Sequence, residues 1–119
     1  MIEVEKIIGF NDVSFYKKGT FFYHREDGPA IEFADGTKKW YFNGRMHREG
    51  GPAYESDGYE EWWINGNLHR EDGPARVISG LGVEWYLNGV CFDTKERWFE
   101  ELTEEQKKKA LYSEYFIRG

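Results

Sequence analysis

The chain has 119 residues, a formal net charge of −6 and an aromatic content of 18%. This length accommodates one domain, in which large flat side chains bury much area per residue. The negative charge argues against nucleic acid and anionic membranes as partners, because both are bound largely through Lys and Arg.

Residues 1–23 predict an N-terminal β cap. Residues 2–10 alternate Ile and Val with acids and end in an apolar run, and the Asn-Asp pair at 11–12 signals a turn. Residues 13–16 and 20–23 predict two further strands around a Lys-Gly turn. The last of these stands where a first repeat would be but lacks its Trp and Asn-Gly, as is typical of terminal repeats.

Residues 24–92 repeat two interleaved phrases. His-Arg-Glu-x-Gly-Pro-Ala begins at His24, His47 and His69. Trp-x-x-Asn-Gly begins at Trp40, Trp62 and Trp85. Self-similarity at a fixed period indicates a repeat architecture. Because Asn-Gly is the strongest short-range signal for a type I′ turn, each copy predicts a β-hairpin.

Turn signals set the expected bounds of the repeat strands. Between an Asp-Gly pair and the next Asn-Gly pair lie six-residue strands at 37–42 and 59–64, and the third copy has a longer loop at 79–82. Proline lacks the N–H that a ladder needs, so each Gly-Pro predicts a bend or bulge at a strand entrance.

Strand alternation divides the side chains between two faces. The first face is apolar in every copy and is expected to be the core: Trp40, Phe42, Trp62, Ile64, Trp85 and Leu87. The second mixes charge with an aromatic: Lys39, Tyr41, Glu61, Trp63, Glu84 and Tyr86. Its three aromatics form a row across the sheet. Either this row is covered by the N-terminal strands or C-terminal helices, or it is exposed and binds a partner.

Residues 93–119 predict a helical cap. Helices are expected at 94–102 and 104–117, because the segments starting at Asp93 and Thr103 have capping-box spacing. The second helix carries an apolar group: Leu111, Tyr112, Tyr115 and Phe116. We expect the helices to close an otherwise unpaired sheet edge, with a partner contact as the alternative.

The repeated polar residues are expected to be structural. Equivalent histidines would lie about 10 Å apart, too far to share a metal ion that needs ligands at about 2 Å. Phe92 stands where a fourth histidine would, which favours packing. The arginines are expected to tie their loops through carboxylates and carbonyls, with an anion site as the alternative. Cys91 aligns with Met46 and Leu68 and is predicted to be buried and inert rather than nucleophilic.

Several classes of function are therefore not expected. We recognise no catalytic motif, and expect no enzyme, metal, cofactor or small-molecule substrate. The single cysteine fits a reducing compartment, and the acidic N-terminus lacks the basic region of a signal peptide. We expect a soluble, cytoplasmic protein.

With these phrases in hand, residues 24–92 resemble the MORN family and its looser variants. The resemblance implies a mainly β fold, an antiparallel meander of consecutive MORN-like β-hairpin repeats with a short α-helical C-terminal cap. The His-Arg-Glu-x-Gly-Pro-Ala phrase departs from the standard repeat and looks like arrays in phage, giant-virus and some bacterial proteins. Members of the broader family act as protein scaffolds, and some are linked to phospholipids.

Size, acidity and repeat type also resemble phage-encoded inhibitors of sirtuin-domain, NAD-degrading bacterial defence proteins. That resemblance implies a non-enzymatic module in the host cytoplasm that binds a larger defence protein and blocks its activation. The residues expected to contact the partner are Tyr41, Glu61, Trp63, Glu84, Tyr86, Tyr112, Tyr115 and Phe116. The alternatives are a structural or scaffold repeat with protein or lipid contacts, and an enzyme of unrecognised type.

Overall fold

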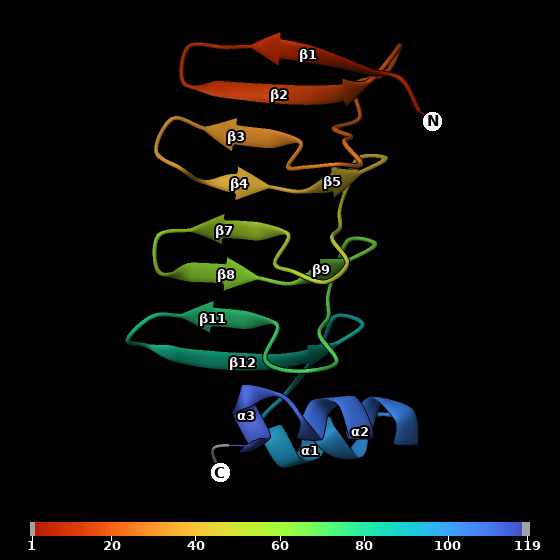
Figure 1. Ribbon diagram of the computed structural model, residues 1–119, viewed down its shortest axis with the longest axis vertical. Coiled ribbons are helices and arrows are strands. Elements are labelled where there is room, and N and C mark those ends of the chain that lie inside the picture. The colour runs from red at the N-terminus through yellow and green to blue at the C-terminus, as the bar shows by residue number, and fades with distance from the viewer. Residues whose placement is uncertain (1, 118–119) are drawn as a thin grey trace.

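The computed structural model describes residues 2–117 and stacks β-hairpins edge to edge (Figure 1). The main sheet has the order β1-β2-β3-β4-β7-β8-β11-β12-β13, with antiparallel neighbours. Its strands are β1 (Val4–Ile8), β2 (Asp12–Lys17), β3 (Ile31–Phe33), β4 (Lys38–Lys39), β7 (Tyr54–Ser56), β8 (Tyr59–Glu61), β11 (Arg76–Ile78), β12 (Gly82–Leu87) and β13 (Val90–Phe92). The prediction of a mainly β chain of antiparallel hairpins with short C-terminal helices is confirmed.

Two of the repeats each contain a second, shorter hairpin outside the main sheet. These hairpins pair β5 (Tyr41–Phe42) with β6 (Arg45–Met46), and β9 (Trp63–Ile64) with β10 (Asn67–Leu68). In the third copy, the end of β12 pairs with β13 instead. Each turn has positive φ at both central residues, with Asn43, Asn65 and Asn88 at 50°, 49° and 49°. The Asn-Gly pairs therefore form the predicted turns, since L-residues other than Asn and Asp rarely adopt this conformation.

The expected six-residue strands at 37–42 and 59–64 are wrong in one respect, because each is interrupted at its tryptophan. The N–H of Trp40 donates to the Ala53 carbonyl in the main sheet (2.6 Å), and the Trp40 carbonyl accepts from the N–H of His47 (3.0 Å). Trp62 makes the equivalent bonds, so the chain changes partners at each tryptophan and enters the short hairpin. Only in the third copy does one strand, β12, run through.

The N-terminal strands differ from their prediction at one point. β1 and β2 pair as expected, but residues 20–23 form no strand and contribute only the Tyr16–Tyr23 bridge. The Thr20 hydroxyl donates to the Lys17 carbonyl (2.8 Å) and accepts from the N–H of Phe22 (3.0 Å), which closes a turn. This side-chain bonding competes with ladder formation.

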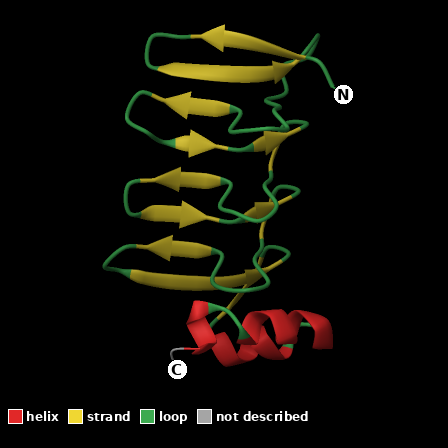
Figure 2. Cartoon of the chain, in the orientation of Figure 1, coloured by secondary structure: helices red, strands yellow, loops and turns green. Residues whose placement is uncertain are grey.

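Three short helices lie together at the end of the stack beyond β13 (Figure 2). They are α1 (Lys95–Glu100), α2 (Glu104–Leu111) and α3 (Glu114–Ile117). The capping box at Thr103 is confirmed, with Thr103 and Gln106 bonding reciprocally. The predicted start at Asp93 is wrong by one residue, because the Thr94 hydroxyl accepts from the N–H of Arg97 (3.1 Å) and caps α1.

The predicted helix 104–117 is broken at residues 112–113. The Ser113 hydroxyl donates to the Ala110 carbonyl (2.7 Å), a contact that favours ending a helix over continuing it. Leu111 and Tyr115 therefore do not share a face: Leu111 is exposed, and Tyr115 packs against the core.

The hydrophobic core is concentrated where the helices meet the last hairpin. The rings of Trp85 and Trp98 lie 4.7 Å apart, and Trp98 is completely buried. The remaining members are Leu102 and Ala110, with Leu87, Phe92, Phe99, Tyr115 and Phe116 packed around them. Further up the stack the core is thin.

Two burial predictions need correction. Trp40 and Trp62 are only half-buried and Phe42 is 39% exposed, so the expected core face is less covered than the sequence suggested. Cys91 is exposed, not buried. Leu68, at the equivalent position one repeat earlier, is buried beneath the next hairpin, whereas β13 is the last strand of the sheet.

Candidate binding surfaces

One face of the stack is covered by its own arginines. The guanidinium carbons of Arg25, Arg48 and Arg70 lie 4.2, 3.9 and 3.7 Å from the ring centroids of Phe15, Trp40 and Trp62, respectively. A guanidinium stacks well on an aromatic face. Each His-Arg-Glu-x-Gly-Pro-Ala loop therefore folds over the aromatic that precedes it.

The other residues of the phrase hold that arginine in place. The Nη1 atoms of the three arginines donate to the carbonyls of Pro29, Pro52 and Pro74 at 3.2, 3.0 and 3.1 Å. A Cβ on Gly28, Gly51 or Gly73 would lie 2.7 to 2.8 Å from the guanidinium carbon, so the close approach requires glycine. The alanines that follow are completely buried. The predicted loop-tying role of the arginines is confirmed.

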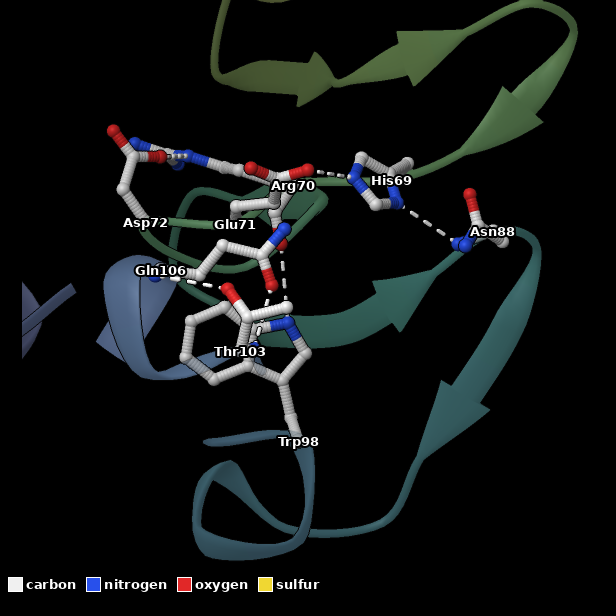
Figure 3. Close-up of polar contacts among 8 residues, drawn as sticks. All are labelled: His69, Arg70, Glu71, Asp72, Asn88, Trp98, Thr103 and Gln106. Atoms are coloured by element: carbon white, nitrogen blue, oxygen red, sulfur yellow. Dashed lines mark hydrogen bonds and ion pairs between the residues drawn. The ribbon is translucent and has the colours of Figure 1, made fainter. Parts of the chain in front are cut away.

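The histidines join each repeat to the next one. Their Nδ1 atoms accept from the backbone N–H of Asn43, Asn65 and Asn88 at 2.8, 2.9 and 2.9 Å. An Nδ1 that accepts leaves the proton on Nε2, and in His69 that atom lies 2.7 Å from Glu71 (Figure 3). Within residues 2–117, no three His, Cys, Asp or Glu side chains come together as metal ligands would.

Trp98 closes the third copy from below. Its indole N–H donates to the Arg70 carbonyl (3.1 Å; Figure 3), and its ring covers Trp85 much as Arg70 covers Trp62. Tyr115 fills the remaining space, 5.9 Å from the Trp85 ring and 5.5 Å from the Arg70 guanidinium. A helical tryptophan thus takes over the covering role of a repeat arginine.

The opposite face carries what we call the aromatic row: Tyr16, Tyr23, Tyr41, Trp63 and Tyr86. Tyr16 and Tyr23 stack at 4.8 Å, and Tyr23 and Tyr41 lie 5.2 Å apart. All five side chains are half-buried. The sequence predicted the last three members. Tyr16 and Tyr23 were missed, because they are joined by an isolated bridge between β2 and a segment that forms no strand.

The helices do not cover this row. Trp85 and Tyr86 point to opposite faces of β12, and the helical side chains Trp98 and Tyr115 pack on the Trp85 side. Tyr86 stays half-buried, with part of its surface accessible. Of the two arrangements that the sequence left open, a layer of C-terminal helices over the row is therefore not the one observed.

The two expected acidic contact residues are bound within the face. Glu61 and Glu84 flank Arg76, with N–O distances of 3.1 and 2.6 Å. Burial alone would lower the pKa of Arg76, but the Glu84 hydrogen bond and the neighbouring negative charges raise it overall. Glu61 also accepts from the Trp63 indole (3.0 Å), and Glu84 from the Tyr86 hydroxyl (3.4 Å). The row is thus fixed by its own charges.

Three phenols of the row, those of Tyr23, Tyr41 and Tyr86, have a raised pKa. The hydrogen bond with Tyr16, helped by burial, raises the pKa of Tyr23 to about 12. Burial raises the pKa of Tyr41, and burial followed by the contact with Cys91 raises that of Tyr86. These rings therefore offer apolar area and hydroxyl groups without charge.

The C-terminal candidates lie apart from the row. Tyr115 and Phe116 pack against the core, and Tyr112 is 81% exposed. The structure thus brings Tyr41, Glu61, Trp63, Glu84 and Tyr86 together and separates the three helical aromatics from them.

Tyr112 borders a cleft on the arginine-covered side. The cleft, about 560 Å³ in volume, lies between the second and third phrase loops and the end of α2. Its walls include Arg48, Glu49, Trp62, Arg70, Lys109 and Tyr112. The cleft could not be predicted from the sequence, because it joins loops and a helix that are far apart along the chain.

The fold and the row define a β-hairpin repeat protein with one face covered by arginine loops and one open aromatic face. No family model, curated protein or solved structure matches the chain. Across residues 2–117, every helix is too short or too polar to cross a membrane.

Proposed function

We propose that the protein is a non-enzymatic binding module that contacts a protein partner through the aromatic row. The observation that carries this proposal is the row itself: five half-buried aromatics along one face of the stack, of which Tyr16, Tyr23 and Tyr41 contact one another. Tyr and Trp dominate the binding energy of protein interfaces, and rigid anchors lose little conformational entropy on binding. Because Glu61 and Glu84 share Arg76 as their partner, burying the three at an interface leaves one net negative charge for a basic group of the partner to match.

The resemblance to phage inhibitors suggests the partner. We propose a larger bacterial defence protein, a sirtuin-type NADase, whose activation the module blocks by occupying a surface. The test is NAD consumption by the purified NADase with its phage trigger, in the presence and absence of this protein. Suppression at stoichiometric concentrations is expected, and unchanged consumption would reject this partner.

The role of the row is tested separately from the identity of the partner. Trp63→Ala should weaken binding to the captured partner by about 2 kcal/mol or more, as expected for an interface anchor. Phe10→Ala is the matched control, since this aromatic is 99% exposed in the turn between β1 and β2 and lies off the row. Equal affinity of Trp63→Ala and wild type would remove the row from the interface.

The alternative of a scaffold with lipid contacts predicts a different result. Co-sedimentation with liposomes containing anionic phospholipid should leave this acidic chain in the supernatant. Sedimentation with the liposomes would favour the scaffold over the inhibitor.

A further inference from the structure

The three arginine loops differ at two hydrogen bonds: one from Nη1 to a glutamate, which among the residues described Arg25 and Arg48 make, and one from Nε. The Nε atoms of Arg25 and Arg70 donate to Asp27 and Asp72 at 3.0 and 2.8 Å. The second phrase has Gly50 in place of that aspartate. Among the residues described, Arg48 pairs through Nη1 alone, with the Pro52 carbonyl at 3.0 Å and Glu55 at 3.4 Å. The second loop keeps the stacked arginine of the others, but its backbone differs at Gly50, which has φ +79° where the aspartates of the other loops do not have positive φ, and it lacks the carboxylate for Nε.

This unpaired edge belongs to a formed cleft. Arg48 and Gly50 line the same cleft of about 560 Å³ as Lys109 and Tyr112. Such a volume suits a small ligand or a few side chains of a peptide. Trp62 and Ile64 contribute apolar surface. The cleft is on the arginine-covered side, because Trp62 and Trp63 alternate to opposite faces, so it is separate from the aromatic row.

Three cations and three carboxylates line the cleft, so its formal charges balance, but two of the carboxylates are already engaged within it. Asp72 is paired with Arg70, and Glu71 lies 2.7 Å from His69. Glu49 remains, against Arg48 Nε and the exposed Lys109, for which the described part of the chain supplies no ion-pair partner. A planar guanidinium edge beside an ammonium group favours a carboxylate.

We propose that this cleft binds an acidic side chain of a polypeptide partner, whose carboxylate takes the place that Asp27 and Asp72 occupy in the other loops. The apolar walls would receive the residue next to it. The proposal does not depend on the function of the aromatic row.

The probe is acetyl-Asp-Leu-amide, titrated into the ¹⁵N-labelled full chain while the arginine Nε–H signals are followed by NMR. The Arg48 signal should shift saturably, whereas those of Arg25 and Arg70 should stay, because aspartates already fill their Nε positions. The Asn counterpart should bind about tenfold more weakly or not at all, since it lacks the charge. Equal movement of all three signals, an equal effect of acetate alone, or no shift at Arg48 would overturn the proposal.

Substitution of Gly50 provides the matched test. Gly50 has φ +79°, and a Cβ there would meet open space, so Asp and Asn both fit with the same backbone strain. Gly50→Asp should weaken dipeptide binding about tenfold or more, because it supplies an internal carboxylate, while Gly50→Asn should change it by less than about twofold. Both variants should keep the wild-type backbone spectrum. Equal binding by the two folded variants would overturn the proposal.

Discussion

Both faces of this repeat stack carry aromatic and charged side chains, but these side chains pack differently on the two faces. On one face, the Arg70 guanidinium stacks on the Trp62 ring at 3.7 Å. The Arg70 side chain is held there by a hydrogen bond to the Pro74 carbonyl of the same loop. On the other face, the Trp63 indole N–H donates to Glu61, and the side chain is half-buried. A thin β stack can therefore be stabilised from one side only, which leaves the second side available for binding.

The largest expected effect lies at the helical end of the covered face. Trp98→Ala should lower the free energy of unfolding by about 3–5 kcal/mol, because it empties a fully buried site and removes the bond to the Arg70 carbonyl. Urea denaturation measures it. Trp98→Phe should recover part of the loss by restoring ring contact with Trp85. A loss below about 1 kcal/mol for the alanine variant would mean that the helices are dispensable.

A smaller effect is expected in the loops. Gly51→Ala should destabilise by about 1–3 kcal/mol, because its Cβ would lie 2.7 Å from the Arg48 guanidinium carbon. In an Arg48→Ala background the same substitution should cost much less, since the clash is gone. Additive losses in this double-mutant cycle would contradict the proposed loop packing.

The smallest expected change in stability comes from the ionisation of two tyrosines at high pH. The pKa of Tyr23 and of Tyr59 is raised to about 12, in Tyr59 by burial and then by the Glu61 hydrogen bond, from an ordinary value of 10.0. The folded state therefore holds protons that the unfolded state releases. The contribution to stability is complete below pH 10 and is lost as the pH rises toward 12.

Urea midpoints at about pH 9 and about pH 11 measure this loss, and the double change Tyr23→Phe with Tyr59→Phe should flatten the dependence. The same slope in the double variant would assign the alkaline loss to other groups.

Much of the fold could be predicted from short local motifs in the sequence. Asn-Gly at three places predicted positive φ, and Asn43 has it because a two-residue hairpin needs the mirror-image turn. Interruption of the strands at Trp40 was not predictable, since it depends on hydrogen bonds to Ala53, just before β7, and to His47, just after β6. Exposure of Cys91 likewise depends on β13 being the last strand. Periodicity describes an interior repeat and not its ends.

The candidate sites divide in the same way. Alternation along single strands placed Tyr41, Trp63 and Tyr86 on one face. The ion pairs of Glu61 and Glu84 with Arg76 form between neighbouring strands, so they could not be predicted from alternation along one strand. In the second phrase the missing aspartate is visible as Gly50, but its meaning depends on where the Arg48 side chain lies.

The division between a covered face and a binding face is tested by changing the adjacent Trp62 and Trp63 separately to alanine. Stability and partner binding are measured for both variants. Trp62→Ala should lower the free energy of unfolding by about 2–4 kcal/mol, because Arg70 loses its stacking partner. Trp63→Ala should cost about 1 kcal/mol of stability and most of the binding. If Trp63→Ala unfolds the protein, or if Trp62→Ala abolishes binding while leaving stability intact, the division between a covered face and a binding face is contradicted.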